Sequence, residues 1–225
     1  MDKTKKGLNI ERPTPELLER YEKLFDNDRD DVLKEEVLEY FFKSKFPNNN
    51  DLHEVLVKVT LLNSFYNTQI LNKNLVNIAR HIVELEIDKK LRSDDISIVN
   101  DIAYKTNEYK TEEINNIYSF ASKYCSWHEP DKYPIVDSYT KGMLYYINKN
   151  SLYGKNYYGN SFTQESLNDY EKYVDIYNRF LIAFDLSGYS YKRIDKYLWK
   201  YSKEYKEKYK EDLGINDSNQ KLMLF

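Results

Sequence analysis

One carboxylate, Asp137, stands in a more specific setting than any other acidic residue of the sequence. It follows the apolar segment Tyr133-Pro-Ile-Val136, and a helical pattern begins directly after it at Ser138. Pro134 removes a backbone donor and biases Tyr133 away from helix, so the segment should be extended. An aspartate at this point can cap the following helix by accepting from its first backbone amides. It can also be a lone carboxylate directed into a cleft between two helices.

The helical pattern that precedes this segment carries further side chains that could do chemistry. Lys123 could form a Schiff base if it were desolvated, but a single lysine on such a helix is more often solvated, and we expect the solvated state. Trp127 could stack on an extruded base, although packing in the core is the favoured interpretation. His128 could contact a base or a phosphate, or it could cap the C-terminal end of the helix. Both roles of His128 stay open at this point.

Amide and aromatic side chains supply additional candidates for ligand contacts. Asn63, Asn67 and Gln69 close an apolar helix, where they could fill a gap in a duplex, read base edges, or serve as ordinary helix-end residues. Tyr139 is one of 23 tyrosines, some of which could offer stacking surfaces. The three histidines have no ligand-like spacing, and no glycine-rich phosphate loop is present, so we predict neither a metal site nor a cofactor.

The elements that must position these residues are helical in pattern throughout. Apolar residues recur at helical spacing, and a content of 6 glycines and 5 prolines argues against an all-β fold with many tight turns. The expected helices span residues 16–23, 31–46, 52–70, 75–85, 93–103, 111–126, 138–148, 165–185 and 190–209. We therefore predict an all-α fold, compact and two-lobed, in a single domain over residues 1–225. Residues 52–148 would form the core lobe, and residues 11–46 would join residues 165–210 in the second lobe, because neither terminal segment has enough apolar surface alone.

Composition places limits on the partners and the compartment. The formal charge of −3 provides no global basic field of the kind that advertises nucleic-acid binding. The single cysteine fits a reducing cytoplasm, and the polar N-terminus has no apolar signal core. Nowhere do enough apolar residues run together to span a membrane. We therefore expect a cytoplasmic protein with no membrane partner.

The C-terminal segment Tyr189–Lys210 is locally basic, with 8 basic and 3 acidic residues. The favoured interpretation is the solvated outer face of a terminal helix, and the sharper one is an edge that contacts phosphates. In the second case Arg193 and Lys196 would bind DNA together with Lys132 and Lys141, which lie closer to the Asp137 element.

The Tyr133-Pro-Ile-Val-Asp137 element, placed between two helices, resembles the helix-hairpin-helix DNA glycosylase superfamily. That superfamily has a similar aromatic-Pro-Ile-hydrophobic-Asp element whose aspartate is catalytic. The apolar segment Leu56–Gln69 also resembles the first core helix of that fold, whose polar end faces DNA. The resemblance covers about residues 52–148. It implies that Asp137 stabilises an oxocarbenium-like sugar and orients a water, and that the partner is DNA.

The sequence departs from the superfamily pattern at two places. The family hairpin carries glycines whose amides bind a DNA phosphate, whereas the corresponding stretch Tyr104–Thr111 has no glycine. The lysine of bifunctional members would fall near Asn115 or Asn116, and Lys123 lies about two turns later. The alignment therefore gives no support for a lyase step.

Two functions from different classes follow. The first is a monofunctional DNA glycosylase-like hydrolase that removes a damaged or modified base, as in base-excision repair. The second is a non-catalytic helical module that binds nucleic acid or a protein on the same scaffold. The retained Asp137 element favours the enzyme, and the missing hairpin glycines favour the module.

Overall fold

The computed structural model describes residues 10–93, 95–104, 117–149 and 162–213, and every regular element within these ranges is a helix. The predicted all-α class is therefore confirmed. The helices are α1 (Pro15–Asp26), α2 (Arg29–Glu39), α3 (Leu52–Tyr66), α4 (Asn72–Glu84), α5 (Ile87–Arg92), α6 (Ile98–Tyr104), α7 (Tyr118–His128), α8 (Ser138–Lys149), α10 (Tyr170–Ala183) and α11 (Tyr191–Leu213). A π-helical turn, η1 (Tyr40–Lys45), continues α2, and a 3₁₀ turn, η3 (Glu165–Asn168), precedes α10. The glycine-free stretch that follows Tyr104 lies outside the described residues.

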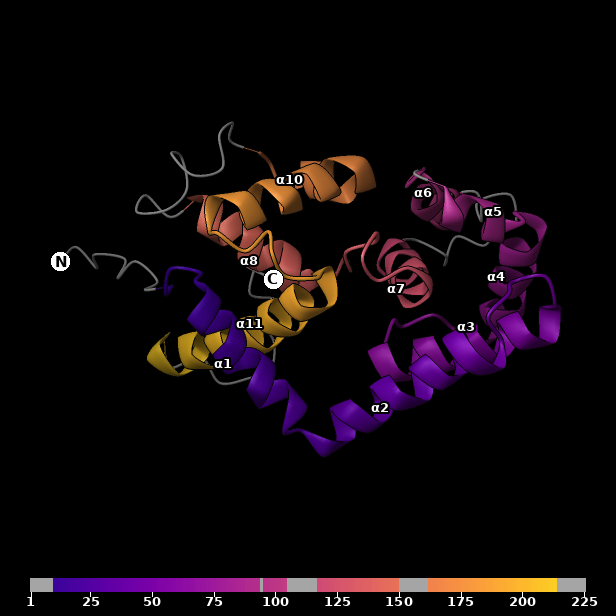
Figure 1. The fold of residues 1–225 in the computed structure, drawn as a ribbon, viewed down its shortest axis with the longest axis horizontal. Helices are drawn as coiled ribbons and strands as arrows, with labels where there is room; N and C mark the ends of the chain where they lie inside the picture. Colours follow the sequence, from indigo (N-terminus) through magenta and orange to yellow (C-terminus); the bar gives the residue numbers. More distant parts are fainter. Residues whose placement is uncertain (1–9, 94, 105–116, 150–161, 214–225) are drawn as a thin grey trace.

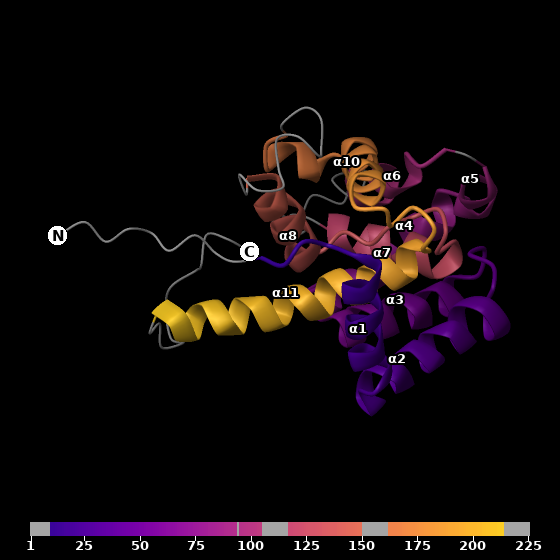
Figure 2. The ribbon, with the colours of Figure 1, turned by 60° about the vertical axis from the view of Figure 1, so that its left-hand side comes forward.

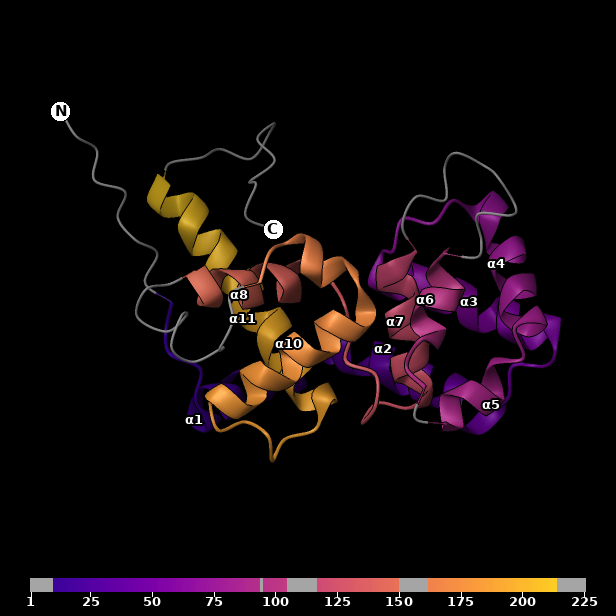
Figure 3. The same cartoon turned by 90° about the horizontal axis from the view of Figure 1, so that it is seen from above.

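The helices fall into two groups in space. Figure 1 and Figure 3 show α3, α4, α5 and α6 on one side, and α1, α8, α10 and α11 on the other. Figure 2 shows α11 as a long rod beneath α8, with α1 lying against it. Helix α1 packs on α11, so segments from the two ends of the chain are in contact, as the apolar stripes predict. Helix α8 also packs on α11, and the division into lobes at residues 52–148 stays a prediction.

Short polar side chains start several of these helices. The Thr14 hydroxyl accepts from the Leu17 amide at 3.2 Å, and Pro15 occupies the first helical position of α1. The Asp51 carboxylate accepts from two amides of the first turn of α3, and the Asp169 carboxylate caps α10. These caps satisfy backbone donors that have no partner within the helix.

Several helices end or begin where the periodicity did not predict it. The helix expected over residues 52–70 ends at Tyr66, because Asn67 and Gln69 adopt left-handed backbone conformations with φ of 47° and 60°. The helix expected over residues 165–185 is divided at Asp169, which caps α10. Helix α5 was not predicted at all, and the helix expected from residue 111 is described only from Tyr118 onward.

Helix α7 is the central element of the described structure. Every side chain from Phe120 to His128 is buried, and the helix packs against α3, α6 and η1. A helix covered on all sides has no solvated face, so its polar side chains must find partners inside the protein. The buried position of α7 therefore places Lys123 in the interior.

Candidate functional site

A cavity of about 710 Å³ lies between α2, α7, the start of α8 and α11. Its volume is within the range of small-molecule sites in proteins. The exit of α3 contributes part of the wall. The predicted site residues that line it are Asp137, Lys123, Asn67, Gln69, Trp127, Tyr139, Lys141 and Lys196. The cavity thus brings together residues that are far apart in the sequence.

Asp137 reaches the cavity because the segment before it is held by four hydrogen bonds. The Tyr170 hydroxyl donates to the Pro134 carbonyl at 3.1 Å, and the Tyr173 hydroxyl donates to the Ile135 carbonyl at 2.6 Å. The Val136 amide donates to the Ser122 hydroxyl at 2.9 Å, and Lys123 Nζ donates to the Val136 carbonyl at 3.1 Å. These bonds fix a segment without regular secondary structure, whose backbone groups have no helix to satisfy them.

The two roles foreseen for Asp137 occur together. Its Oδ1 accepts from the Thr140 amide at 2.7 Å, which is the capping interaction for α8. The same half-buried side chain lines the cavity. A carboxylate at the N-terminal end of a helix is favoured by the helix dipole, so the negative charge of Asp137 suits this place.

Lys123 is buried, with only 4% of its surface exposed, so the expectation that it is solvated was wrong. Its Nζ donates to Ser119 Oγ at 2.6 Å and to the Val136 carbonyl at 3.1 Å. Burial lowers the pKa of Lys123, and the nearby carboxylates of Asp137 and Asp195 oppose this effect. An amine in such a setting is easier to deprotonate and therefore more nucleophilic than a surface lysine.

A second carboxyl group, Asp195 of α11, also lines the cavity and was missed in the sequence. Its Oδ1 is buried and has no hydrogen-bond partner among the described residues. Burial raises the pKa of Asp195 well above its usual range, the charge of Asp137 raises it further, and Lys123 opposes both. In the sequence Asp195 is one acid in a lysine-rich segment. The one signal that could have indicated a buried position is its neighbour Ile194, which is a core residue.

Aromatic side chains form much of the cavity wall. Trp127 packs in the core, as expected, and also faces the cavity, and its Nε1 donates to the Tyr66 hydroxyl at 3.1 Å. The remaining aromatic residues of the wall are Phe25, Phe65, Tyr118, Tyr139, Tyr191 and Trp199. Flat apolar surfaces of this kind can stack on a planar ligand.

Four predicted binding residues do not line the cavity. Asn63 stabilises the exit of α3, because its Nδ2 donates to the Ile70 carbonyl at 3.0 Å and its Oδ1 accepts from the Ile70 amide at 3.1 Å. Lys132 Nζ donates to the Leu91 carbonyl at 3.2 Å. Arg193 is paired with Glu22, and His128 belongs to a separate buried cluster.

The buried cluster around His128 serves the connection between η1 and α3. Lys58 is fully buried, and its Nζ donates to the Phe46 carbonyl at 3.0 Å and the Asn48 carbonyl at 2.8 Å. His128 Nε2 lies 3.4 Å from the same Nζ. Burial and the neighbouring Lys58 and Lys43 lower the pKa of His128 well below its usual range. The His128 ring is therefore a neutral, structural group.

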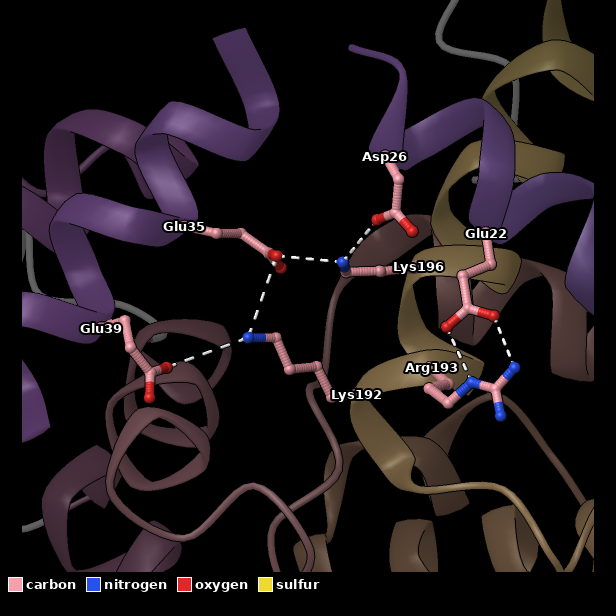
Figure 4. Close-up of polar contacts among 7 residues, drawn as sticks. All are labelled: Glu22, Asp26, Glu35, Glu39, Lys192, Arg193 and Lys196. Carbon is pink, nitrogen blue, oxygen red and sulfur yellow. Dashed lines mark hydrogen bonds and ion pairs between the residues drawn. The ribbon is translucent and has the colours of Figure 1, made fainter. Parts of the chain in front are cut away.

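Ion pairs join α11 to α1 and α2 (Figure 4). Four of the residues that form them line the cavity, and we call this partly exposed edge its mouth: Glu35, Glu39, Lys192 and Lys196. Arg193 Nε and Nη2 contact the two carboxylate oxygens of Glu22 at 2.7 and 2.6 Å. Lys196 Nζ lies 2.9 Å from Asp26 and 3.0 Å from Glu35. Lys192 Nζ is 3.8 Å from Glu35 and 4.0 Å from Glu39, both on α2. Lys192, Arg193 and Lys196 thus have carboxylate partners within the protein, and a phosphate-contacting role for Arg193 and Lys196 stays a prediction.

No group of three or more histidine, cysteine or acidic residues is placed to hold a metal ion within the described ranges. No helix of the described part is long and apolar enough to cross a membrane.

Comparison with known proteins gives a family without a stated activity. The family profile described as "HI_0787_N: N-terminal domain" matches residues 17–132, which include Lys123 but end before Asp137 and Asp195. A Haemophilus influenzae protein, described as "Uncharacterized protein", is 32% identical over 154 residues, which is 68% of this chain and 68% of the relative. No solved structure matches the chain significantly. On the strength of these two similarities, the chain belongs to the HI_0787_N family.

Proposed function

We propose that the cavity binds a nucleotide of DNA and cleaves the N-glycosidic bond to a damaged or modified base. The observation that carries this proposal is the convergence of Lys123 and Asp137 in one cavity with aromatic walls. The resemblance of the Asp137 element to the helix-hairpin-helix glycosylases supports the same proposal. A volume of about 710 Å³ suits a single extruded nucleotide.

Asp137 is suited to stabilise the positive charge that develops on the sugar as the base departs. The transition state of glycosidic cleavage is oxocarbenium-like, and a fixed carboxylate beside it is worth more in a cavity than in water. Asp137 is fixed by the hydrogen bond from the Thr140 amide and by the bonded segment before it. Little reorganisation is therefore needed when the charge appears.

Lys123 is suited to attack the anomeric carbon in place of water. A neutral amine has two N–H donors and one lone pair, and Lys123 Nζ already donates to Ser119 Oγ and the Val136 carbonyl. With both donors used, the lone pair is available for a bond to carbon. This assignment revises the sequence-based expectation of a monofunctional enzyme, which rested on the position of Lys123 about two turns beyond the family's lysine and on the expectation that Lys123 is solvated.

The carboxylates at the cavity mouth limit the form of DNA that could bind there. Glu35 and Glu39 of α2 line the mouth opposite Lys192 and Lys196 of α11. A duplex could not approach this edge without displacing or compensating these carboxylates. An extruded nucleotide presents fewer phosphates than a duplex groove, so we expect contacts with single-stranded or locally opened DNA to dominate.

The test is release of free base from oligonucleotides that each carry one damaged or modified base, run in parallel with the corresponding free nucleosides. Borohydride should trap a covalent complex with wild-type protein and none with Lys123→Met. Lys89→Met, at an exposed lysine of α5, is the matched control and should trap as well as wild type. Release of the base without a trapped covalent complex would mean that water, activated by Asp137, attacks the sugar instead of Lys123. If wild-type protein releases no base from any substrate, the enzyme reading fails and the non-catalytic helical module takes its place.

A further inference from the structure

Asp195 lines the cavity, and its Oδ1 is buried with no hydrogen-bond partner among the described residues. A buried polar atom without a partner costs free energy, and such atoms are uncommon in folded proteins. Where one lines a cavity, a ligand can supply the missing partner. Helix α11 presents Asp195 from the side of the cavity formed by the C-terminal segment, whereas Asp137 and Lys123 come from α7 and the segment that follows it.

Three charged groups act on Asp195 from the elements packed around it. They are Lys123 of α7, Asp137 of the segment before α8, and Glu35 of α2, and each acts through its charge. Burial raises the pKa of Asp195 well above its usual range, and the two carboxylates raise it further. Lys123 opposes this rise, but its own pKa is lowered by burial. Both directions disfavour the ammonium form of Lys123 and the carboxylate form of Asp195.

The cavity therefore holds two carboxyl groups in contrasting surroundings. Asp137 is half-buried, caps a helix and accepts a hydrogen bond from the Thr140 amide. Asp195 Oδ1 is buried without such a donor, which suits the acid. In many enzymes that cleave glycosidic bonds, two carboxyl groups lie in contrasting environments of this kind. One of them acts as the base or stabilises charge, and the other donates a proton.

We propose that Asp195 is the proton donor to the leaving base, an inference that rests on the proposed function. The Lys123 lone pair forms a bond to the anomeric carbon, and the electron pair of the carbon–nitrogen bond passes to the base. Asp195 gives its proton to a ring nitrogen of the base and becomes a carboxylate. The lysine nitrogen loses a proton to Asp137, so charge and atoms balance. The substrate class is then a base that is a poor leaving group as an anion.

The first experiment compares Asp195→Asn with wild type on two kinds of oligonucleotide. One kind carries an unalkylated modified purine such as hypoxanthine, which must be protonated to leave well. The other carries 7-methylguanine, which is already cationic and leaves without a donor. The variant should lose about 100-fold or more of the rate on the first and about threefold or less on the second, since a positioned acid contributes on that scale. Equal loss on both would overturn the donor role while leaving the proposed function in place.

The second experiment needs no substrate and guards against a variant that folds poorly. Infrared difference spectra of wild type against Asp195→Asn at pH 7 should show the carbonyl band of a neutral carboxylic acid in wild type only. Asp137→Asn should move the titration of that band to lower pH, because it removes a like charge. Asp131→Asn, at an exposed turn, should leave the band unchanged. Absence of the acid band in wild type at pH 7 overturns the inference whatever the kinetics show, and absence of base release by wild type from every substrate overturns it together with the proposed function.

Discussion

The hydrogen bond from Tyr173 to the Ile135 carbonyl should be measurable as a defined part of the protein's stability. The Tyr173 side chain is fully buried, and its hydroxyl donates at 2.6 Å to a carbonyl of the extended segment before Asp137. Tyr173→Phe keeps the ring and leaves that carbonyl without this donor. Orphaning one buried carbonyl costs about 1–3 kcal/mol, which for a chain of this length lowers the Tm by about 2–4 °C per kcal/mol.

Tyr197→Phe is the matched control for this prediction. Tyr197 is also fully buried, but its hydroxyl has no hydrogen-bond partner among the described residues. Removing an unpartnered buried hydroxyl should leave stability within about 0.5 kcal/mol of wild type or raise it. Urea unfolding gives both values as shifts in midpoint at constant slope. If the two variants lose the same stability, the hydrogen bond is not what holds the segment, and the reasoning is refuted.

Three further predictions concern the cavity and its surroundings. Asp137→Asn should reduce base release by about 100-fold or more and change the free energy of unfolding by less than about 1 kcal/mol, since asparagine still accepts from the Thr140 amide; retention of full activity in a base-release assay would contradict it. The free energy of unfolding should fall as the pH drops below about 6.5, by up to about 1.4 kcal/mol per pH unit, because His128 is neutral in the folded protein and gains a proton on unfolding. In urea titrations at a series of pH values, His128→Gln should show a weaker dependence of this free energy on pH in that range. Arg193→Gln and Glu22→Gln should each lower stability by about 1 kcal/mol or less in low-salt melts, and neither should change the salt dependence of DNA binding; a drop of about one in that slope for Arg193→Gln alone would mean that the arginine contacts phosphate.

Local signals were sufficient for the Asp137 element. Pro134 and the apolar triplet predicted an extended segment, and the aspartate predicted the start of a helix, so α8 begins at Ser138 as expected. These properties depend on neighbours within a few residues, and a single sequence contains all of them. The start of α1 at Thr14 and Pro15 was predictable for the same reason.

The interior of the cavity depends on contacts that a single sequence does not show. Lys123 was expected in solvent because one lysine on a helix usually is, but α7 is covered by α3, α6 and η1. Asp195 was overlooked because it lies in a basic segment, and its environment is supplied by α2 and α7. The Arg193–Glu22 pair joins residues 171 positions apart, so charge counting in the C-terminal segment could not reveal it.

The packing of α1 on α11 affects the order in which this protein can assemble on the ribosome. Helix α11 contributes Asp195 and the mouth lysines, and it is the last described element to be synthesised. Contacts between segments so distant in sequence form slowly, because the chain between them must first be ordered. A nascent chain that has produced only α1 to α10 would have one wall of the cavity missing and the apolar face of α1 uncovered, a state in which transiently exposed surface favours aggregation. Completion of α11 is therefore the step at which the site forms and the amino-terminal helix acquires its partner.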